Sequence, residues 1–167
     1  MCQRTIHRLP RHGKLYNWYA VNDSRGLCPA GWHVPGDTDW TQLENYVVSR
    51  GYPNRNIVNS AGNVFKSCRR EGSIKGGDCN TSEHPRWVSH ETEHHGLDEF
   101  GYAALPGGNR QSFGSSGGIG RFGDWWSSTE ASPEDAWYRG LIYLNSVLLR
   151  YHLHKSSGFG VRCIRSN

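Results

Sequence analysis

Long apolar runs are missing from this sequence of 167 residues, of which 35% are hydrophobic. No stretch approaches the roughly 18 consecutive apolar residues that mark a membrane-spanning helix, so no membrane span is expected. The opening stretch, Met1 to Arg8, also lacks the apolar segment of a secretory signal. We therefore expect the chain as given to be mature-like, cytoplasmic or a fragment of a longer protein.

Runs of basic residues and paired cysteine motifs are missing as well. The formal net charge is +4 and the pI lies near 8.9, but lysine and arginine are scattered along the chain. Because no basic stripe forms, a nucleic-acid partner is not expected. No C-x-x-C pair occurs, which removes support for zinc-ribbon and thioredoxin-type sites.

The cysteines leave their pairing open. Five are present, at Cys2, Cys28, Cys68, Cys79 and Cys163, so at least one thiol has no partner within the chain. A bridge between Cys68 and Cys79 would close a short glycine-rich loop and contribute roughly 2–3 kcal/mol in the chain-entropy model. A bridge between Cys28 and Cys163 would close a long loop and contribute about 4–5 kcal/mol. The alternative is a cytosolic protein with five reduced thiols.

Large aromatic residues and glycine are abundant in this sequence, whereas aliphatic residues are few. The chain has 7 Trp, 8 Tyr and 21 Gly, with a single Met. Each buried Trp or Tyr removes a large area from water, so a few of them can replace many aliphatic side chains. The length and this composition predict one loop-rich domain with an aromatic core.

Several helices and strands are predicted before the C-terminal region. Leu15–Val21 is an aromatic run typical of an opening strand. Asp37–Arg50 is the clearest helix, since its apolar positions recur at three and four and Asp37 can cap its start. A second, shorter helix is predicted within Ile57–Ser67, and the polar stretch Cys68–Gly101 is predicted to be a long loop. Short strands are expected at Gly101–Gly108 and Trp125–Thr129.

The C-terminal region predicts a hairpin with two different faces. Side-chain character alternates with period two from Trp137 to Tyr143, which is typical of a strand. Asn145-Ser146 supplies a turn, Val147–Tyr151 the returning strand, and Gly158–Ile164 a further strand. One parity carries Trp137, Arg139, Leu141 and Tyr143, and the other carries Tyr138, Gly140, Ile142 and Leu144.

Catalytic and metal motifs occur only in unsuitable contexts. His90–His94 matches H-E-x-x-H, but Gly96 ends any helix there and Phe100 occupies the place of a third histidine ligand. Gly114–Gly118 matches G-x-S-x-G and Gly118–Gly123 matches G-x-G-x-x-G, yet no helix follows either match. His152 and His154 could chelate a metal from one side of a strand, although solvent-exposed histidines are the simpler interpretation.

Six motifs occur in a fixed order along the chain: Tyr16–Val21, Cys28–Pro35, Trp40–Tyr46, Phe100–Gly108, Trp125–Glu130 and Gly158–Cys163. The chain resembles the Fibrobacter succinogenes major paralogous domain, an extracellular module related to the C-type-lectin-like fold, as are formylglycine-generating enzymes. The resemblance implies an α+β domain with a twisted antiparallel sheet, one or two helices and long loops, spanning 15–167 after an N-terminal extension, 1–14. It also implies that the two ends of the domain lie close together, which would suit a Cys28–Cys163 bridge.

Part of this family is similar to the variable proteins of diversity-generating retroelements, in which a reverse transcriptase rewrites codons near the C-terminus. The insert Ser82–Trp87 resembles members of the same gut-bacterial subgroup. The resemblance implies a fixed scaffold at Trp137, Arg139, Leu141, Tyr143, Leu148, Arg150, Lys155, Gly158 and Phe159. It implies a variable ligand-binding surface at Tyr138, Gly140, Ile142, Leu144, Asn145, Val147, Leu149, Tyr151, His152, Leu153, His154 and Ser157.

These positions predict what the chain binds. If they are exposed, Ile142, Leu144, Leu149 and Leu153 form an aliphatic patch edged by tyrosine and histidine, which favours a protein or glycoprotein ligand over a bare sugar. The alternative places several of these aliphatic side chains in the core. Since His152 and His154 share the parity of the scaffold residues, the returning strand is expected to end near Tyr151.

Two other functions share the fold and remain alternatives. A formylglycine-generating-type enzyme needs reactive cysteines beside a groove, whereas Cys28 and Cys163 are better used as a bridge. A calcium-dependent lectin needs calcium-binding patterns that are absent near Trp126. We therefore expect no catalytic residues, no cofactor and no metal, with an extracellular or cell-surface location that family members reach through exported, anchored forms.

Overall fold

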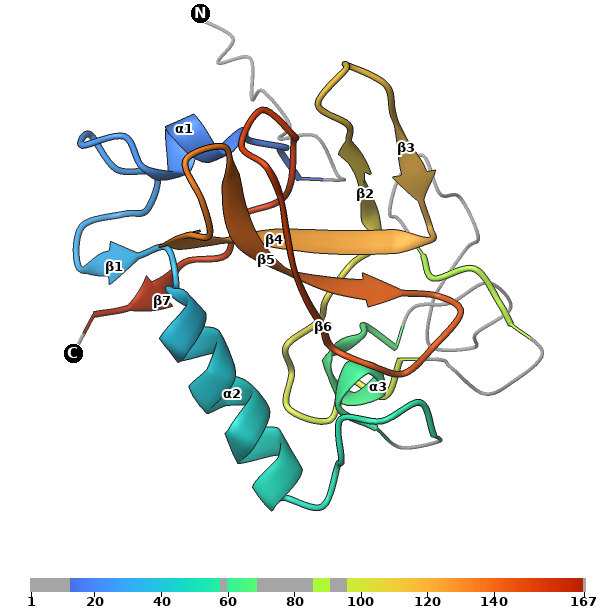
Figure 1. Cartoon of the computed structure of the whole chain (residues 1–167). Helices are drawn as coiled ribbons and strands as arrows, with labels where there is room; N and C mark the ends of the chain where they lie inside the picture. The colour runs from blue at the N-terminus through green and yellow to red at the C-terminus, as the bar shows by residue number, and fades with distance from the viewer. Residues whose placement is uncertain (1–12, 58–59, 69–85, 91–95, 167) are drawn as a thin grey trace, which may run out of the picture.

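The computed structural model describes residues 13–57, 60–68, 86–90 and 96–166. Within them the chain is an α+β domain, as the sequence predicted, with a curled sheet and helices on both of its sides (Figure 1). The helices are α1 (Trp18–Val21), α2 (Asp37–Ser49) and α3 (Ala61–Phe65). The strands are β1 (Trp32–His33), β2 (Gly107–Arg110), β3 (Ser116–Ile119), β4 (Phe122–Glu130), β5 (Asp135–Ile142), β6 (Leu149–His154) and β7 (Ile164–Arg165).

The larger sheet is mixed, where an antiparallel one was expected. Its five strands lie in the order β3-β2-β4-β5-β6, and β2 runs parallel to β4 through the single pair Gly108–Gly123. The remaining neighbours are antiparallel. The chain enters β2 from the long connection after α3, so β2 lies beside β4 without a hairpin between them and is free to run parallel to it.

The opening segment is a helix and not the predicted strand. Tyr16 forms only an isolated bridge with Phe159, and the chain then turns into α1. The side chain of Asn17 accepts a hydrogen bond from the Ala20 amide and caps the helix start. Trp18 and Val21 are both buried, because their spacing of three places them on the same helix face. Local capping therefore outweighed the strand preference of the aromatic run.

Helix α2 is confirmed, but its start differs from the prediction. Gly36 is the N-cap, and its amide donates to the carboxylate of Asp39 at 2.8 Å. Asp37 lies in the first turn and its carboxylate is used elsewhere, in ion pairs with the hairpin. Helix α3 is shorter than the predicted range, because its Gly62 amide donates to the backbone of Ser146 and Lys66 already pairs with Ala104.

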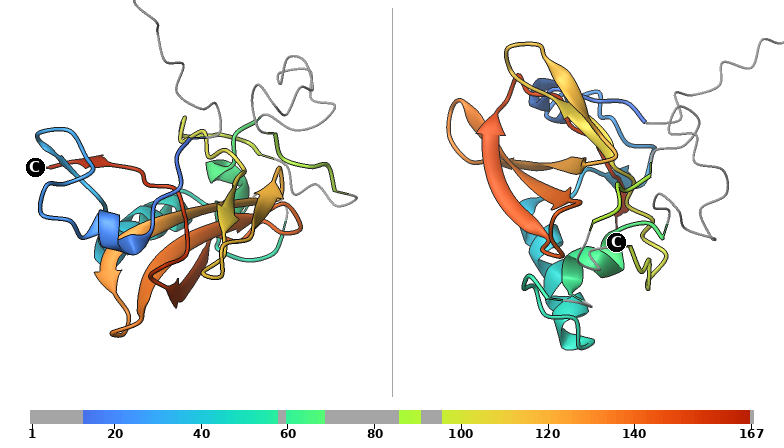
Figure 2. Two further views of the ribbon diagram at one scale, coloured as in Figure 1. Left: turned by 90° about the horizontal axis from the view of Figure 1, so that it is seen from above. Right: turned by 90° about the vertical axis from the view of Figure 1, so that its right-hand side faces the viewer.

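Two aromatic cores lie on opposite sides of the larger sheet. Figures 1 and 2 show α1 on one side of this sheet and α2 and α3 on the other side. The neighbouring residues Trp125 and Trp126 point to opposite sides and each enters one core. The core beneath α2 and α3 is built on Trp40, Val47, Ala61, Val64, Phe65, Trp87, Ala104, Trp125, Leu141 and Leu148. The core beneath α1 is built on Trp18, Val21, Val34, Trp126, Ala136 and Phe159.

The Cys28–Cys163 disulfide is present and joins distant parts of the chain. Its Cα atoms are 5.7 Å apart across a sequence separation of 135. Beside it, His33 in β1 pairs with Ile164 in β7, so the bridge and this short sheet hold the C-terminal segment against the N-terminal region. The second expected bridge involves Cys79, which lies outside the described residues. Among the helices of the described part, none is long and apolar enough to cross a membrane.

Candidate functional site

The register of β4, β5 and β6 gathers alternate residues of the predicted hairpin onto one side of the sheet. Gly140 lies between Asp124 of β4 and Leu149 of β6, and Tyr138 lies between Trp126 and Tyr151. Directly paired residues point to the same side of a sheet, so these side chains share one surface. We call the part of this surface that α1 leaves uncovered the hairpin face. It consists of Phe122, Asp124, Tyr138, Gly140, Ile142, Leu149 and Tyr151.

The opposite side of the same strands is fixed by ion pairs with α2. The guanidinium of Arg139 is fully buried and donates to Asp37 at 2.7 Å, and Arg150 donates to the other carboxylate oxygen at 2.9 Å. Arg150 also stacks on the ring of Trp137 at 3.6 Å from its centroid. Burial raises the pKa of Asp37, but the hydrogen bonds from both arginines outweigh it and hold that pKa below its usual range. We call this side, with Trp137, Arg139, Leu141 and Arg150, the scaffold face.

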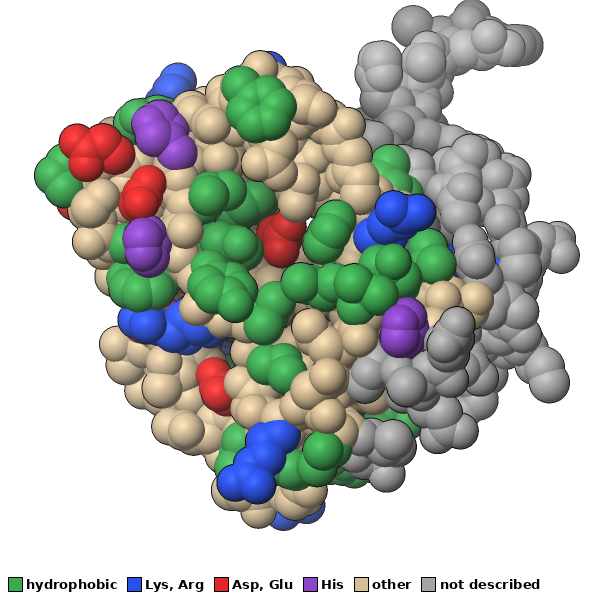
Figure 3. Space-filling view, turned by 45° about the vertical axis from the view of Figure 1, so that its right-hand side comes forward, with side chains coloured by type: hydrophobic (Ala, Val, Ile, Leu, Met, Phe, Trp, Pro, Cys, Tyr) green, Lys and Arg blue, Asp and Glu red, His purple; other side chains and the backbone are tan. Residues whose placement is uncertain are grey.

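The hairpin face carries exposed aromatic and aliphatic side chains. Tyr151 is 53% exposed and Leu144, at the hairpin tip, is 47% exposed, whereas Tyr138, Ile142 and Leu149 are half-buried. The rings of Tyr138 and Tyr151 lie 6.4 Å apart between centroids. Figure 3 shows hydrophobic side chains gathered over this part of the molecule. Ile142, Leu144 and Leu149 therefore lie outside both cores, whereas Leu153 is half-buried and packs against the core beneath α1.

The two histidines belong to the other side of β6. The strand continues to His154, so the expected end near Tyr151 is wrong and the alternation persists through His152 and His154. His152 lies edge-on to Trp137, and its Nδ1 is 2.9 Å from the carboxylate of Asp135. Both histidines are exposed, but they face away from Tyr138 and Tyr151. No group of three or more potential metal ligands occurs within the described ranges.

The remaining predicted positions lie at the hairpin tip or inside the protein. Asn145 and Val147 are half-buried, and the backbone oxygen of Asn145 accepts a hydrogen bond from the buried Lys66 ammonium at 2.5 Å. Ser157 is fully buried, so its predicted exposure is wrong. It lies between Lys155 and Phe159 in the segment that fills the core beneath α1. The H-E-x-x-H match extends over 91–94, which lies outside the described residues.

Asp124 is a polar residue of this face that the sequence reasoning missed. It is only 8% exposed, and its Oδ2 accepts a hydrogen bond from Nδ2 of Asn109 at 2.7 Å. Gln111 in turn donates to Oδ1 of Asn109 at 3.3 Å. Burial raises the pKa of Asp124 to about 6, which the bond from Asn109 only partly offsets. Its shared parity with Trp126 was the available signal, but Asp124 lies just before the predicted strand Trp125–Thr129, at the end of a glycine-rich stretch, whereas β4 begins at Phe122.

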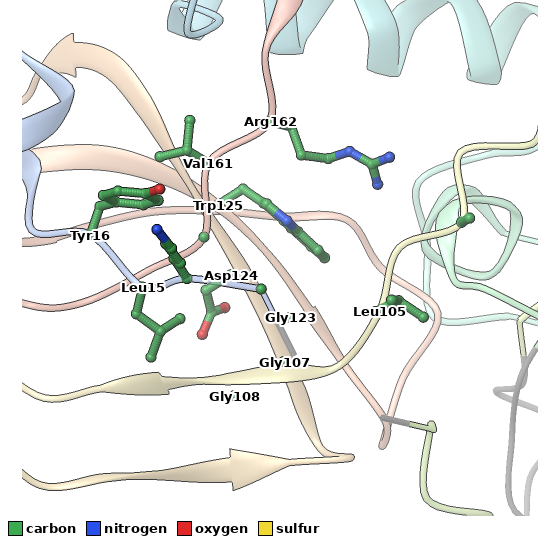
Figure 4. A pocket seen from close by; sticks show the side chains of 14 residues that line it. Leu15, Tyr16, Leu105, Gly107, Gly108, Gly123, Asp124, Trp125, Val161 and Arg162 are labelled. Atoms are coloured by element: carbon green, nitrogen blue, oxygen red, sulfur yellow. The ribbon is translucent and has the colours of Figure 1, made fainter. Parts of the chain in front are cut away.

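A cavity of about 460 Å³ adjoins Asp124 on the side toward β2. Figure 4 shows the Asp124 side chain beside Leu15, with Trp125 and Arg162 further along the wall. Several glycines, among them Gly107, Gly108 and Gly123, form the wall without side chains, which leaves the cavity wide. Asp124 therefore lies at the boundary between this cavity and the open hairpin face.

Comparisons with known proteins place the whole chain in one family. No curated protein and no solved structure matches the chain significantly. A family model does match: the Fibrobacter succinogenes major domain, over residues 3–165. Since this match covers nearly the entire sequence, the chain belongs to the Fibrobacter succinogenes major domain family.

Proposed function

We propose that this protein is a non-catalytic recognition module that binds a protein or glycoprotein ligand through its hairpin face. The observation that carries the proposal is the shared register of Tyr138, Leu149 and Tyr151, which places aromatic and aliphatic side chains side by side on one accessible surface. Tyrosine combines a large contact area with few rotatable bonds and a polar tip, which suits protein recognition. Exposed apolar surface of this kind is uncommon unless it serves an interaction.

The rigidity of the hairpin supports the same function. Both strands are paired over their length, and Arg139, Arg150 and Asp37 fix the opposite face to α2. A surface that is already ordered loses little conformational entropy when a ligand binds. The hairpin face can therefore change its side chains without loss of its backbone position, as a variable surface requires.

The proposal extends to the fold relationship, the diversification and the location of the protein. It takes the domain to be C-type-lectin-like, and it takes the codons of the twelve positions predicted to vary, from Tyr138 to Ser157, to be targets of a diversity-generating retroelement. The disulfide supports an extracellular or cell-surface location, since such bonds persist in oxidising compartments. The disulfide also occupies Cys28 and Cys163, so neither of them can be a reactive thiol of a formylglycine-generating-type reaction, which supports a role without catalysis.

Binding to a panel of purified extracellular glycoproteins and to their deglycosylated forms tests the proposal. We expect a panel member to bind the wild type, with or without its glycans, and to lose at least about tenfold in affinity for Tyr151→Ala, which removes a central aromatic contact. Tyr19→Ala is the matched control, because Tyr19 is 58% exposed but lies on α1. Binding that Tyr151→Ala leaves unchanged, or that Tyr19→Ala weakens equally, would contradict the proposal.

The coding DNA tests the diversification separately. Adenine-rich template codons at the positions predicted to vary, next to a reverse-transcriptase gene, are the expected result.

Calorimetry with calcium and free sugars tests the lectin alternative. Saturable calcium-dependent sugar binding would contradict the proposed protein or glycoprotein ligand.

A further inference from the structure

Asp124 is a nearly buried carboxylate without a cationic partner among the described residues. Its side chain accepts one hydrogen bond, from the neutral amide of Asn109, and this bond uses Oδ2. Oδ1 accepts no hydrogen bond from the described residues, and it is not among the side-chain atoms that are sealed from solvent without a partner. Arg162, which also lines the cavity, stacks instead on Tyr102, with its guanidinium carbon 4.2 Å from the ring centroid. One oxygen of the carboxylate therefore remains available to a ligand.

Gly140 makes room for this carboxylate in the middle of the hairpin face. A Cβ built on Gly140 would lie 2.8 Å from Oδ1 of Asp124, so the carboxylate leans over the strand where any other residue would carry a side chain. The same Cβ would lie 3.4 Å from the ring of Tyr138 and 3.8 Å from Cβ of Leu149. Oδ1 is thus bordered by an aromatic ring and an aliphatic side chain on the surface that faces the ligand.

This arrangement is costly for the free protein and favourable for a complex. A carboxylate removed from water without a cation is destabilised, whereas a charge-assisted hydrogen bond in such surroundings is strong. The neighbouring Tyr138 and Tyr151 rings offer apolar surface for the alkyl part of a long basic side chain and a π-face for its charge. The surroundings of Asp124 match a group with a positive end and an apolar stem.

We propose that Asp124 anchors a subsite for an organic cation, the ammonium of a lysine or the guanidinium of an arginine of a protein ligand, at the centre of the hairpin face. The inference rests on the proposed function, because it names the chemistry of one contact made by that face. Asn109 holds one carboxylate oxygen in place, and the cation pairs with Oδ1 over Gly140. A metal ion fits less well, since Asp124 belongs to no group of three or more potential ligands among the described residues.

The test uses Nα-acetyl-lysine amide and Nα-acetyl-arginine amide as probes, with Nα-acetyl-norleucine amide and Nα-acetyl-glutamine amide as neutral probes of similar length. Backbone amide shifts of the labelled protein are followed by NMR up to about 10 mM of probe, which saturates a site with a Kd near 1 mM. We expect saturable shifts at Asp124, Gly140 and Leu149 with the two cationic probes. The neutral probes are expected to bind at least about tenfold more weakly, since only the charged group pairs with the carboxylate.

Two variants separate charge from shape. Asp124→Asn keeps the shape of the side chain and the hydrogen bond from Asn109 but removes the charge. We therefore expect the affinity for the cationic probes to fall about tenfold and the affinity for the neutral probes to stay unchanged. Gly140→Ala displaces the Asp124 carboxylate and should lower the affinity for the cationic probes to a similar extent. Glu134→Gln is the control for net charge, since this exposed acid lies in the loop before β5, and it should leave binding unchanged.

The outcomes also separate this inference from the proposed function. Absence of saturable shifts with the cationic probes, equal binding of the neutral probes, tighter binding of calcium at Asp124, or indifference to Asp124→Asn each overturns the cation subsite. If a panel glycoprotein still requires Tyr151 while Asp124→Asn changes nothing, the binding face stands and only the subsite is wrong. If the cationic probes bind at Asp124 but no panel ligand depends on Tyr151, the subsite stands and the ligand class of the face is wrong.

Discussion

The scaffold face and the hairpin face lie on opposite sides of the same strands, and they differ in whether their charged side chains are paired within the protein. On the scaffold face, the buried guanidinium of Arg139 meets the carboxylate of Asp37, which Arg150 also pairs. On the hairpin face, the carboxylate of Asp124 accepts one hydrogen bond from the described residues, and its donor is the neutral amide of Asn109. Paired charges fit the structural role of the scaffold face, whereas an unpaired carboxylate beside the exposed ring of Tyr151 fits the proposed recognition of a ligand by the hairpin face.

Removal of Arg139 is expected to have the largest effect on stability. Arg139→Ala leaves Asp37 with the partly exposed Arg150 alone and opens a cavity beneath α2. Loss of one partner of a buried ion pair costs about 3–5 kcal/mol. Chemical denaturation measures the loss. If the free energy of unfolding falls by less than about 1 kcal/mol, the scaffold face does not depend on this ion pair. Charge pairing would then not distinguish the scaffold face from the hairpin face.

Neighbouring residues of β5 provide a second comparison, because they point to opposite sides. Leu141 is fully buried in the core beneath α2, and Leu141→Ala is expected to cost about 2–5 kcal/mol. Ile142 is half-buried on the hairpin face, so Ile142→Ala should cost about 1 kcal/mol. Thermal or denaturant unfolding of both variants checks the difference. Equal losses would mean that Ile142 belongs to the core and is unavailable to a ligand.

Replacement of Asp124 is expected to stabilise the protein at neutral pH. Because burial raises the folded pKa of Asp124 from 3.8 to about 6, the folded state prefers the protonated form. The stability that the protonated Asp124 carboxyl group contributes is complete below the pKa of Asp124 in the unfolded chain, and it is lost as the pH rises through about 6. Asp124→Asn should therefore be about 1–3 kcal/mol more stable than the wild type at pH 7.5, with the advantage vanishing near pH 4.

Denaturation at several pH values measures this difference. A variant that is less stable than the wild type at pH 7.5 would show that the charge of Asp124 stabilises the fold. The carboxylate would then have a structural role, and the contrast between the faces would lose its main argument.

The smallest effect on stability is expected for Tyr151. Its side chain is 53% exposed on an edge strand, so Tyr151→Ala should change the free energy of unfolding by less than about 1 kcal/mol. The same variant is the one expected to reduce ligand binding most. Unfolding and binding measured on one preparation test both statements, and a large loss of stability would assign Tyr151 to the fold and not to recognition.

Much of the fold could be predicted from local patterns. The spacing of Trp40, Leu43 and Val47 predicted α2, and the alternation from Trp137 to Tyr143 predicted β5 and its two faces. The opening helix was missed, because capping by Asn17 and burial of Trp18 outweighed the strand preference of its aromatic residues. The end of β6 was misplaced, because pairing with β5 extends a strand through residues whose own pattern is polar.

The candidate site divides in the same way. Period-two alternation in the sequence by itself determined which residues of β5 share a side, since that period is a property of the extended backbone. Only the tertiary structure decided that Asp124 lies over Gly140, that Ser157 is buried, and that β6 continues to His154. These facts depend on the register between strands and on the segments that cover them, which are contacts between residues far apart in the chain. Sequence periodicity carries no record of them.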